Sequence, residues 1–460
     1  MRLLLINPLN SAISYKNSNV SRWSKYRIWK PLGLLVVAGL TPSDWDITII
    51  DENLGLPDYK QLPRPDLVGI TAFTSQAARA YKISDEFRKK NIPVVMGGIH
   101  ASMCMDEVLK KVDSAVTGEA ESIWGQVLED FKKNKLKRIY KGTHLSLDKS
   151  PVARHDLLPE GYFFGSIQTS RGCPLNCSFC SVTSFNGGKF RRRPIESIIE
   201  EFKTIREKHV LIVDDNFIGT SPVHIAETKE LLRAMIKAKL SKTLITQVTI
   251  NIADDDELLE LTAKAGCKGI FIGFESVNDN GLLEVSKKFN MRSGAKKRDF
   301  KESVRRIHKH GISIVGSFIM GLDVDTKGIG QQIASAAKSY GIDALNAVFM
   351  TPLPGTRLWK KMESEGRITA NKFPEDWDYY TLTFPVVKYK NLSWSNIIDE
   401  NEICNRDYYS ISNILKRFFI NLIFFRNPFM VLATNLSYRN NAVRKYRLRF
   451  QELDIARGDA

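Results

Sequence analysis

Short apolar runs recur along the first 145 residues, and a longer segment of mixed composition follows each of them. The runs are LLLIN, DITIID, DLVGIT, PVVMGG and SAVTG, and they end at Asn7, Asp51, Thr71, Gly98 and Gly118. None alternates strictly between polar and apolar residues, as expected for strands that are buried on both faces of a parallel sheet. The pattern predicts a doubly wound α/β domain over residues 1–145.

The carboxyl ends of these predicted strands carry polar residues and glycines. Ligands of doubly wound sheets bind outside this edge, and a glycine there lets the backbone approach a ligand closely because it has no side chain. We therefore expect a ligand site along this edge. The candidate residues are Asn7, Thr71, Thr74, Ser75, Gln76, Gly97, Gly98, His100, Gly118 and Glu119.

A second series of strands and helices follows a charged connector and is predicted to form another domain over residues 146–360. A chain of 460 residues is also too long for a single core. Repeated strand and helix units of this kind close toward a barrel, and six units leave the barrel incomplete. Its strands are expected near Ile167 and over residues 210–213, 245–250, 269–274, 312–320 and 345–349.

The remaining residues, 361–460, show no clear period and are rich in aromatic residues. We expect a mostly helical C-terminal region there, which caps the barrel or contacts the substrate. Arg426, Asn427 and Pro428 interrupt its most apolar stretch before the ~18 residues that a membrane-spanning helix needs. No acidic residue occurs between Asp407 and Glu452. Together with the formal charge of +16, this asymmetry indicates an anionic partner or surface without deciding which one.

Within that basic interval, the stretch FFINLIFF has two interpretations. It is either an interfacial helix that rests on an anionic membrane or a helix that closes the open side of the barrel, and both would bring it to the substrate entrance. Lys416, Arg417 and Arg426 flank the stretch. Its apolar surface would consist of Phe418, Phe419, Leu422, Ile423 and Phe425.

The sequence SRGCPLNCSFCSV places Cys173, Cys177 and Cys180 on one short segment directly after the first predicted barrel strand. A structural zinc site normally has four protein ligands, and no fourth cysteine or histidine stands beside these three at ligand spacing. Three thiolates on a four-iron cluster leave one iron open to a further ligand. The segment therefore favours an iron–sulfur cluster, and a zinc site with a distant fourth ligand is the alternative.

This cysteine pattern, with Phe179 before the last cysteine, resembles the radical S-adenosylmethionine superfamily. The resemblance extends to VDDNFIG, GFES, SFIMGLD and TPLPGT in the second domain. It implies a 4Fe–4S cluster held by the three cysteines and an S-adenosylmethionine molecule on the open iron. The residues that it implies at the S-adenosylmethionine site are Phe179, Asp214, Asp215, Gln247, Glu275 and Gly321.

The first domain resembles that of the cobalamin-binding class of these enzymes, through PLGLLVVAGLTPSDWDITIIDEN, GGIHAS and GEAE. The resemblance implies a Rossmann-like cobalamin-binding domain, a partial (β/α)6 barrel, and cobalamin contacts from the strand-end residues named above. The chain has no Asp-x-His-x-x-Gly motif, so the cobalt is expected to lack a protein histidine below it. For His100, a hydrogen bond to the edge of the cofactor and a structural loop role both stay open.

The resemblance implies a methyltransferase that acts at an unactivated carbon of a small-molecule or lipid-like substrate, and its plan is nearest to enzymes that methylate hopanoid-type lipids. A radical rearrangement or cyclisation enzyme with the same domains is the alternative. A tRNA methylthiotransferase is set aside because the first domain has Cys104 alone, where a second cluster needs three cysteines. A basic membrane- or nucleic-acid-binding protein with a structural metal is the alternative from another class.

Expected partners include an external electron donor of the flavodoxin or ferredoxin type, whereas nucleic acid is not expected. The opening MRLLLINPLN has the composition of a buried strand and lacks the charged-then-apolar pattern of a signal peptide. A cytoplasmic protein is therefore expected, with peripheral membrane contact through the C-terminal region as an addition.

Overall fold

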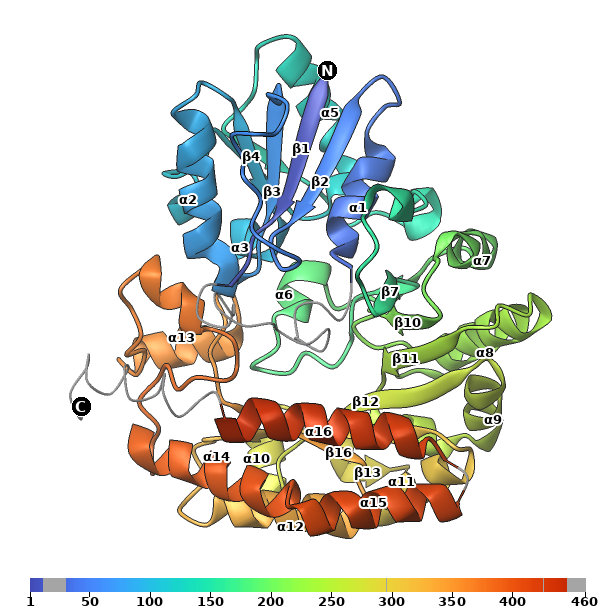
Figure 1. Cartoon of the computed structure of the whole chain (residues 1–460). Helices are drawn as coiled ribbons and strands as arrows, with labels where there is room; N and C mark the ends of the chain where they lie inside the picture. The colour runs from blue at the N-terminus through green and yellow to red at the C-terminus, as the bar shows by residue number, and fades with distance from the viewer. Residues whose placement is uncertain (11–29, 295, 425, 445–460) are drawn as a thin grey trace.

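The computed structural model describes residues 1–10, 30–294, 296–424 and 426–444, with the side chains of residues 441–444 left aside. Figure 1 shows two sheets one above the other, with the helix α6 (Val182–Asn186) between them and the last helices along the lower side. The predicted order of a doubly wound domain, a partial barrel and a mostly helical C-terminal region is confirmed.

The first sheet is parallel throughout and has the strand order β2-β1-β3-β4-β5-β6. Its helices include α1 (Leu32–Leu40), α2 (Ala77–Arg88), α3 (Gly98–Met103) and α5 (Trp124–Lys132). The short edge strand β6 was missed by the sequence reasoning, because its three residues lie within the charged connector. The strands are β1 (Arg2–Asn7), β2 (Asp46–Asp51), β3 (Leu67–Thr71), β4 (Val94–Gly97), β5 (Ser114–Thr117) and β6 (Ile139–Lys141).

The strand order of the first sheet reverses between β1 and β3, because β2 lies on one side of β1 and the later strands lie on the other. Doubly wound sheets bind their ligands in the crevice at this switch point, outside the strand carboxyl ends. Asn7 ends β1 and Thr71 ends β3. The fold thus brings two of the sequence-predicted residues to the position where a ligand of this sheet is expected.

The second sheet is also parallel, and its order β16-β15-β12-β11-β10-β7 follows the chain. Neither β7 nor β16 pairs with a further strand of the described residues, so the barrel is open as predicted. The boundaries differ from the expected ranges by one to three residues, most at β11, which ends at Gln247, while residues 250–254 form a short 3-10 helix. The strands are β7 (Phe164–Ile167), β10 (His209–Ile212), β11 (Thr243–Gln247), β12 (Cys267–Glu275), β15 (Ser313–Met320) and β16 (Ala344–Phe349).

Three C-terminal helices pack against the barrel: α14 (Trp394–Tyr408), α15 (Ile411–Ile423) and α16 (Pro428–Arg444). At the end of α14, the Tyr409 hydroxyl donates to the Leu345 carbonyl and accepts from the Leu345 amide. These two backbone groups belong to the edge strand β16, and the tyrosine satisfies them in place of a further strand. This part of the region covers the open side of the barrel.

The positions of α15 and α16 overturn the expectation that the stretch FFINLIFF, most of which lies in α15, reaches the substrate entrance. The side-chain amide of Asn421 in α15 donates to Asp343 Oδ1, just before β16. The side-chain amide of Asn427 donates to the carbonyls of Lys268 and Gly311, and that of Asn435 donates to the Asp343 carbonyl. These carbonyls lie at or just before the starts of β12, β15 and β16. Helix α16 therefore crosses the amino ends of the barrel strands, whereas the cysteine segment follows the carboxyl end of β7.

Contacts at the other end of the barrel join it to the first domain. The Ser184 hydroxyl of α6 donates to the Gly355 carbonyl after β16. A side-chain carbon on Gly355 would lie 2.3 Å from the Met103 sulfur of α3, so the sixth-strand turn touches the first domain. The Asn10 amide donates to the Asp378 carbonyl at 3.2 Å. The carboxyl ends of both sheets therefore face each other across the cysteine segment.

Candidate cluster and cofactor site

The cysteines lie on a segment that leaves the barrel and returns to it, residues 172–190. A two-residue antiparallel pair between β8 (Ser170–Arg171) and β9 (Arg191–Arg192) closes its base. Gly172 has φ +86°, and a Cβ there would lie 2.2 Å from the Lys189 carbonyl oxygen. Only glycine fits this position, because both the left-handed backbone and the close approach exclude a side chain.

Two further backbone hydrogen bonds hold the middle of this segment. The Ser178 amide donates to the Val285 carbonyl at the end of α10 (Asp279–Glu284), and the Leu358 amide at the start of α13 (Arg357–Ser364) donates to the Ser178 carbonyl. Ser178 stands between Cys177 and Cys180. The cysteine segment is thus tied to elements that follow β12 and β16.

The three cysteines line one cavity of about 420 Å³ at the carboxyl ends of the barrel strands. Its other walls come from the ends of β10, β11, β12, β15 and β16. The structure therefore collects around one space most of the residues that the sequence assigned to cluster and S-adenosylmethionine. These are Cys173, Cys177, Cys180, Phe179, Asp214, Asp215, Gln247 and Glu275.

Gly321 is the exception, because it does not line the cavity. It follows β15 with φ +94°, and a Cβ there would meet the ring of Tyr389 at 2.5 Å and Ile397 at 2.6 Å. The glycine lets the chain turn under the C-terminal region. Its assignment to S-adenosylmethionine stays a prediction without support from the cavity.

The three cysteines need not converge on one point to hold an iron–sulfur cluster. Among the described residues, no group of three or more His, Cys, Asp or Glu side chains converges as the ligands of one metal ion do. In an iron–sulfur cluster each thiolate binds a different iron, so the sulfurs need not meet at one point. Burial raises the pKa of all three thiols, that of Cys180 to about 12, and bound metal would deprotonate them.

A buried ion pair in the same cavity was missed by the sequence reasoning. The Lys287 ammonium donates to Glu275 Oε1 at 3.0 Å, and both side chains are almost fully buried. Burial alone lowers the pKa of Lys287, but the neighbouring charge of Glu275 outweighs it and raises the pKa. No motif marks this lysine, because it comes from the loop after α10 and reaches the cavity only in the folded chain.

Glu275 itself has an uncommon backbone. Its φ is +68°, and the pairing register of β12 with β15 shifts between Gly273 and Glu275. A Cβ on Gly273 would lie 2.0 Å from Glu275 Oε1, so the carboxylate folds back over a glycine. Such strained positions cluster at functional sites, which agrees with the placement of Glu275 in the cavity wall.

The adjacent carboxylates Asp214 and Asp215 hold the cysteine segment as well as line the cavity. Asp214 accepts hydrogen bonds from the Thr169 amide and hydroxyl and from the Ser170 hydroxyl. Asp215 accepts from the Gly172 amide at 2.8 Å and from the Asn186 side chain. Both carboxylates therefore stabilise the fold of the cysteine segment. Their roles toward S-adenosylmethionine stay predictions.

Part of the predicted cobalamin edge, Asn7 and the loop of Thr74, Ser75 and Gln76, lies together beside the switch point. The Gln76 side chain donates to Asn7 Oδ1 at 3.2 Å, and the Ser75 carbonyl accepts from Asn10. Thr74, Ser75 and Gln76 are buried. The structure brings the loop after β3 against the end of β1, which is consistent with the predicted site.

Gly97 and Gly98 lie where β4 passes into α3. Gly98 has φ +88°, and a Cβ there would lie 2.6 Å from Thr71 Oγ1 and 3.2 Å from the Ala72 nitrogen. At Gly97 the nearest atom is 3.7 Å away. Gly98 therefore allows the strand ends of β3 and β4 to pack together, in addition to its predicted place at the cofactor edge.

His100 is fully buried inside the first domain. Its Nε2 pairs with the Tyr81 hydroxyl at 2.8 Å, and that hydroxyl donates to Glu107 Oε1. The Trp377 indole from the C-terminal region also donates to Glu107. These contacts give His100 a packing role between domains, while its contact with cobalamin stays a prediction.

Gly118 and Glu119 lie at the end of β5, beside the cysteine segment. Burial alone raises the pKa of Glu119, but hydrogen bonding to Arg191 and the charges of Arg171 and Arg191 outweigh it and lower the pKa. The carboxylate forms ion pairs with both of these barrel arginines, a partner set that the sequence could not show.

Two sequence models match the chain: the B12 binding domain over residues 24–128 and the Radical SAM superfamily over residues 167–337. The bacteriochlorophyllide d C-12(1)-methyltransferase of Chlorobaculum tepidum is 30% identical over 407 residues, which cover 84% of this chain and 84% of that protein. The hopanoid C-2 methylase of Rhodopseudomonas palustris is 29% identical over 348 residues, covering 74% of this chain and 65% of that protein.

The fold has solved counterparts. The radical S-adenosylmethionine methyltransferase TsrM from Kitasatospora setae, solved with cobalamin and a 4Fe–4S cluster bound, matches with a TM-score of 0.62. The match covers 79% of this chain and 78% of that chain at 18% sequence identity. At this identity the likeness concerns the fold alone.

Proposed function

Because the chain belongs to the cobalamin-dependent radical S-adenosylmethionine methyltransferases, we propose that it methylates an unactivated carbon of a small-molecule or lipid-like substrate. When bound, the cluster and S-adenosylmethionine supply the radical chemistry, and cobalamin supplies the methyl group. One observation carries the proposal. The cavity that holds the three cysteines lies at the carboxyl ends of the barrel strands, and the segments beside it contact the first domain at Met103 after β4 and at Glu119 after β5.

The residues of this chain would hold these groups and keep water away from them. Cys173, Cys177 and Cys180 would bind the cluster, and apolar side chains such as Val348 and Met350 form much of the remaining wall. Gln247 and Asn346 are polar side chains in that wall, suited to orienting a substrate. Reduction of the cluster would need an external electron donor, for which a flavodoxin or ferredoxin is the proposed class.

A test of methyl transfer does not need the substrate to be known. The protein is purified without oxygen, its cluster is restored, and hydroxocobalamin, a strong reductant and S-adenosylmethionine with a deuterated methyl group are added. We expect iron–sulfur absorption at ~400 nm and labelled methylcobalamin in the mass spectrum. Unlabelled cobalamin, with both cofactors bound and S-adenosylmethionine cleaved, would contradict methyl transfer and favour the rearrangement or cyclisation alternative.

Lys287 is expected to govern the affinity for S-adenosylmethionine. In Lys287→Met the buried Glu275 carboxylate loses its partner inside the cavity, and a hydrogen bond to a charged group is lost. We expect S-adenosylmethionine to bind at least about tenfold more weakly to the cluster-loaded protein, as measured by equilibrium dialysis. Lys288→Met changes the exposed neighbour and is the control; equal affinities in the two variants, at equal iron content, would disprove this role.

The C-terminal helices also support a proposal of peripheral membrane contact. None of the described helices combines the length and the apolar composition that a membrane crossing requires. Their outer side nevertheless exposes a set of large apolar residues that we call the apolar face of α15 and α16. It consists of Ile411, Leu415, Phe419, Leu422, Ile423, Phe424, Phe429 and Leu436.

The basic residues near the apolar face differ in whether their charge is free to contact a membrane. Lys416 is exposed, but the Arg417 guanidinium donates to the Tyr408 carbonyl and to Asn435 Oδ1 and lies 4.1 Å from the Tyr408 ring. Arg417 is therefore an internal brace, contrary to its expected role beside the membrane. Phe425 lies outside the described residues. An exposed apolar face in an interval without acidic residues fits an anionic bilayer surface.

Co-sedimentation with vesicles tests the membrane proposal. Wild-type protein should sediment with vesicles rich in phosphatidylserine at low salt and less at high salt, since each nearby basic residue contributes about 1 kcal/mol that salt screens. Phe424→Glu with Phe429→Glu should abolish sedimentation. Leu283→Glu, at an exposed apolar residue on α10, is the control. Wild-type protein that stays in the supernatant at low salt would refute membrane contact.

A further inference from the structure

The base of the cysteine segment contains two arginines that face each other. In the β8–β9 pair, Arg171 stands directly opposite Arg191. Like charges at opposite positions of an antiparallel pair repel and destabilise it. Each strand of this pair has only two residues, so its own backbone bonds offer little to offset the repulsion. The pair needs negative charge from elsewhere to stay closed.

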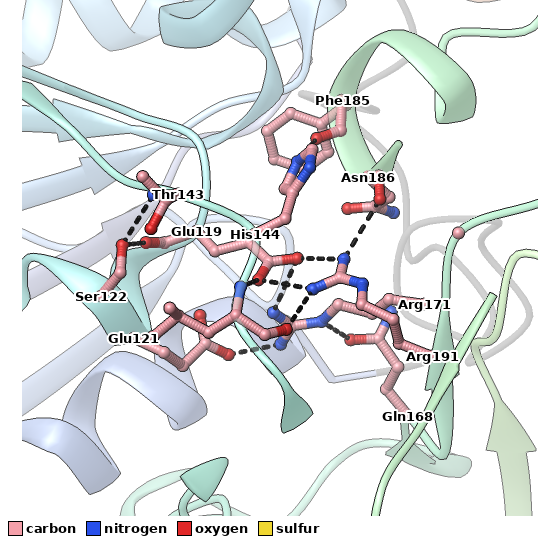
Figure 2. Close-up of polar contacts among 12 residues, drawn as sticks. Glu119, Glu121, Ser122, Thr143, His144, Gln168, Arg171, Phe185, Asn186 and Arg191 are labelled. Atoms are coloured by element: carbon pink, nitrogen blue, oxygen red, sulfur yellow. Dashed lines mark hydrogen bonds and ion pairs between the residues drawn. The ribbon is translucent and has the colours of Figure 1, made fainter. Parts of the chain in front are cut away.

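Two glutamates from the first domain provide this charge, as Figure 2 shows. Glu119 Oε2 accepts from Arg191 Nη1 at 2.9 Å, and Glu119 Oε1 bonds Arg191 Nη2, so the contact is two-pronged. Glu119 Oε1 also lies 3.6 Å from Arg171 Nη1, and Glu121 Oε1 accepts from Arg171 Nη2. The four side chains are between 4% and 13% exposed, so water screens them little. We call them the arginine–glutamate clamp.

The glutamates are held firmly in place by their own domain. Gly118 has φ +72°, and a Cβ there would lie 2.4 Å from the Gly142 carbonyl oxygen. A Cβ on Gly142 would lie 2.3 Å from the Glu119 carbonyl oxygen. Ser122 Oγ donates to that same carbonyl and accepts from the Thr143 amide. Close packing of two glycine turns thus fixes the backbone from which Glu119 extends.

On the barrel side, the clamp connects to the cysteines through few atoms. Arg191 Nη2 donates to the Asn186 carbonyl at 3.1 Å, and the Asn186 side chain donates to Asp215. Asp215 accepts from the amide of Gly172, the residue between Arg171 and Cys173. A change in the clamp would therefore alter hydrogen bonds at both ends of the segment that carries the cysteines.

We propose that Glu119 and Glu121 are positioning residues, which close the base of the cysteine segment only while the first domain is docked. The cobalamin domain would thereby set the geometry of the cluster loop in the other domain. This inference rests on the proposed function for its meaning, but the closure itself can be measured without cluster, cobalamin or substrate. It also gives Glu119 a role other than the cobalamin contact that the sequence suggested.

Hydrogen exchange of the metal-free full-length protein is the first test. Glu119→Gln keeps the shape of the side chain and removes its charge, which leaves Arg191 buried beside Arg171 without compensation. We expect amides of residues 172–190 to exchange about tenfold faster or more, with amides of β1 and β3 unchanged. The control is Glu129→Gln, whose exposed carboxylate forms a loose surface pair with Lys133 at 3.9 Å.

A double substitution separates the clamp from general damage. Glu119→Gln with Arg191→Met removes both charges, and loss of both partners costs less than loss of one. We expect its exchange to return toward that of wild type. Double and single substitutions that accelerate exchange equally would overturn the proposal, as would unchanged exchange in Glu119→Gln. If Glu119→Gln does not fold, the milder Glu121→Gln is judged by the same criteria.

The cluster gives a second, spectroscopic readout. After restoration and reduction of the cluster, the electron paramagnetic resonance spectrum of Glu119→Gln should differ from that of wild type, and chelator should remove its iron several-fold faster. Glu129→Gln should match wild type in both. A spectrum and an iron-loss rate identical to wild type would show that the clamp does not position the cluster loop, whether or not the protein transfers methyl groups.

Discussion

Replacement of Cys173, Cys177 or Cys180 by alanine is expected to reduce the cleavage of S-adenosylmethionine below detection. Each thiolate binds a different iron of the cluster, and all three line the same cavity. No other cysteine lines that cavity, so none of the described ones can replace a missing ligand. The measurement is 5′-deoxyadenosine formed by the reduced protein, together with its iron and sulfide content.

Cys404→Ala is the matched control for these substitutions. Cys404 lies fully buried in α14 and does not line the cavity. Loss of its sulfur leaves a small void that costs about 1 kcal/mol of stability and no cluster ligand. Equal loss of cleavage in all four variants would contradict the assignment of the three ligands.

Gly98→Val is expected to weaken cobalamin binding by about 10–100-fold, because a strained backbone position costs on the order of 1–3 kcal/mol. At φ +88° the new Cβ would press on Thr71 Oγ1 and on the Ala72 backbone, which displaces the end of β3 from the end of β4. These strand ends border the predicted cobalamin edge. Binding is measured by equilibrium dialysis of hydroxocobalamin.

Gly125→Val serves as the control for Gly98→Val, since Gly125 has no atom within 4 Å of its Cβ position and has no positive φ. Iron content should be unchanged in both variants, because the cluster ligands belong to the barrel. Wild-type cobalamin affinity in Gly98→Val would count against the site at this edge. Equal loss of iron and cobalamin would instead indicate that the whole fold is disturbed.

Much of the fold could be predicted from the sequence because its signals are local. Each buried strand of the two parallel sheets is a short apolar run, and helices between them repeat apolar residues at helical spacing. The cysteine segment is similarly self-contained, since Cys173, Cys177 and Cys180 stand close together in the chain. Strand ends such as Asn7 and Thr71 could be placed at one edge because parallel strands share their direction.

The incorrect expectations concern segments whose position depends on distant partners. The apolar and aromatic character of the C-terminal helices is visible in the sequence, but the site where they dock is not. Asn427 donates to the carbonyls of Lys268 and Gly311, which lie 159 and 116 residues earlier in the chain. Asn435 donates to the Asp343 carbonyl, 92 residues earlier. Arg417 has the sequence context of a surface charge, but its hydrogen bonds to the Tyr408 carbonyl and to Asn435 hold it inside the helical region.

The two parallel α/β sheets and the cysteine segment could be predicted from short stretches of sequence, because backbone propensity and ligand spacing act within a few residues. The pairing of buried charges, in contrast, depends on how distant parts of the chain pack. Lys287 reaches Glu275, and Glu119 and Glu121 reach Arg191 and Arg171, across loops or domains. Such pairs form because burial makes an unpaired charge costly, and burial is a property of the packed chain.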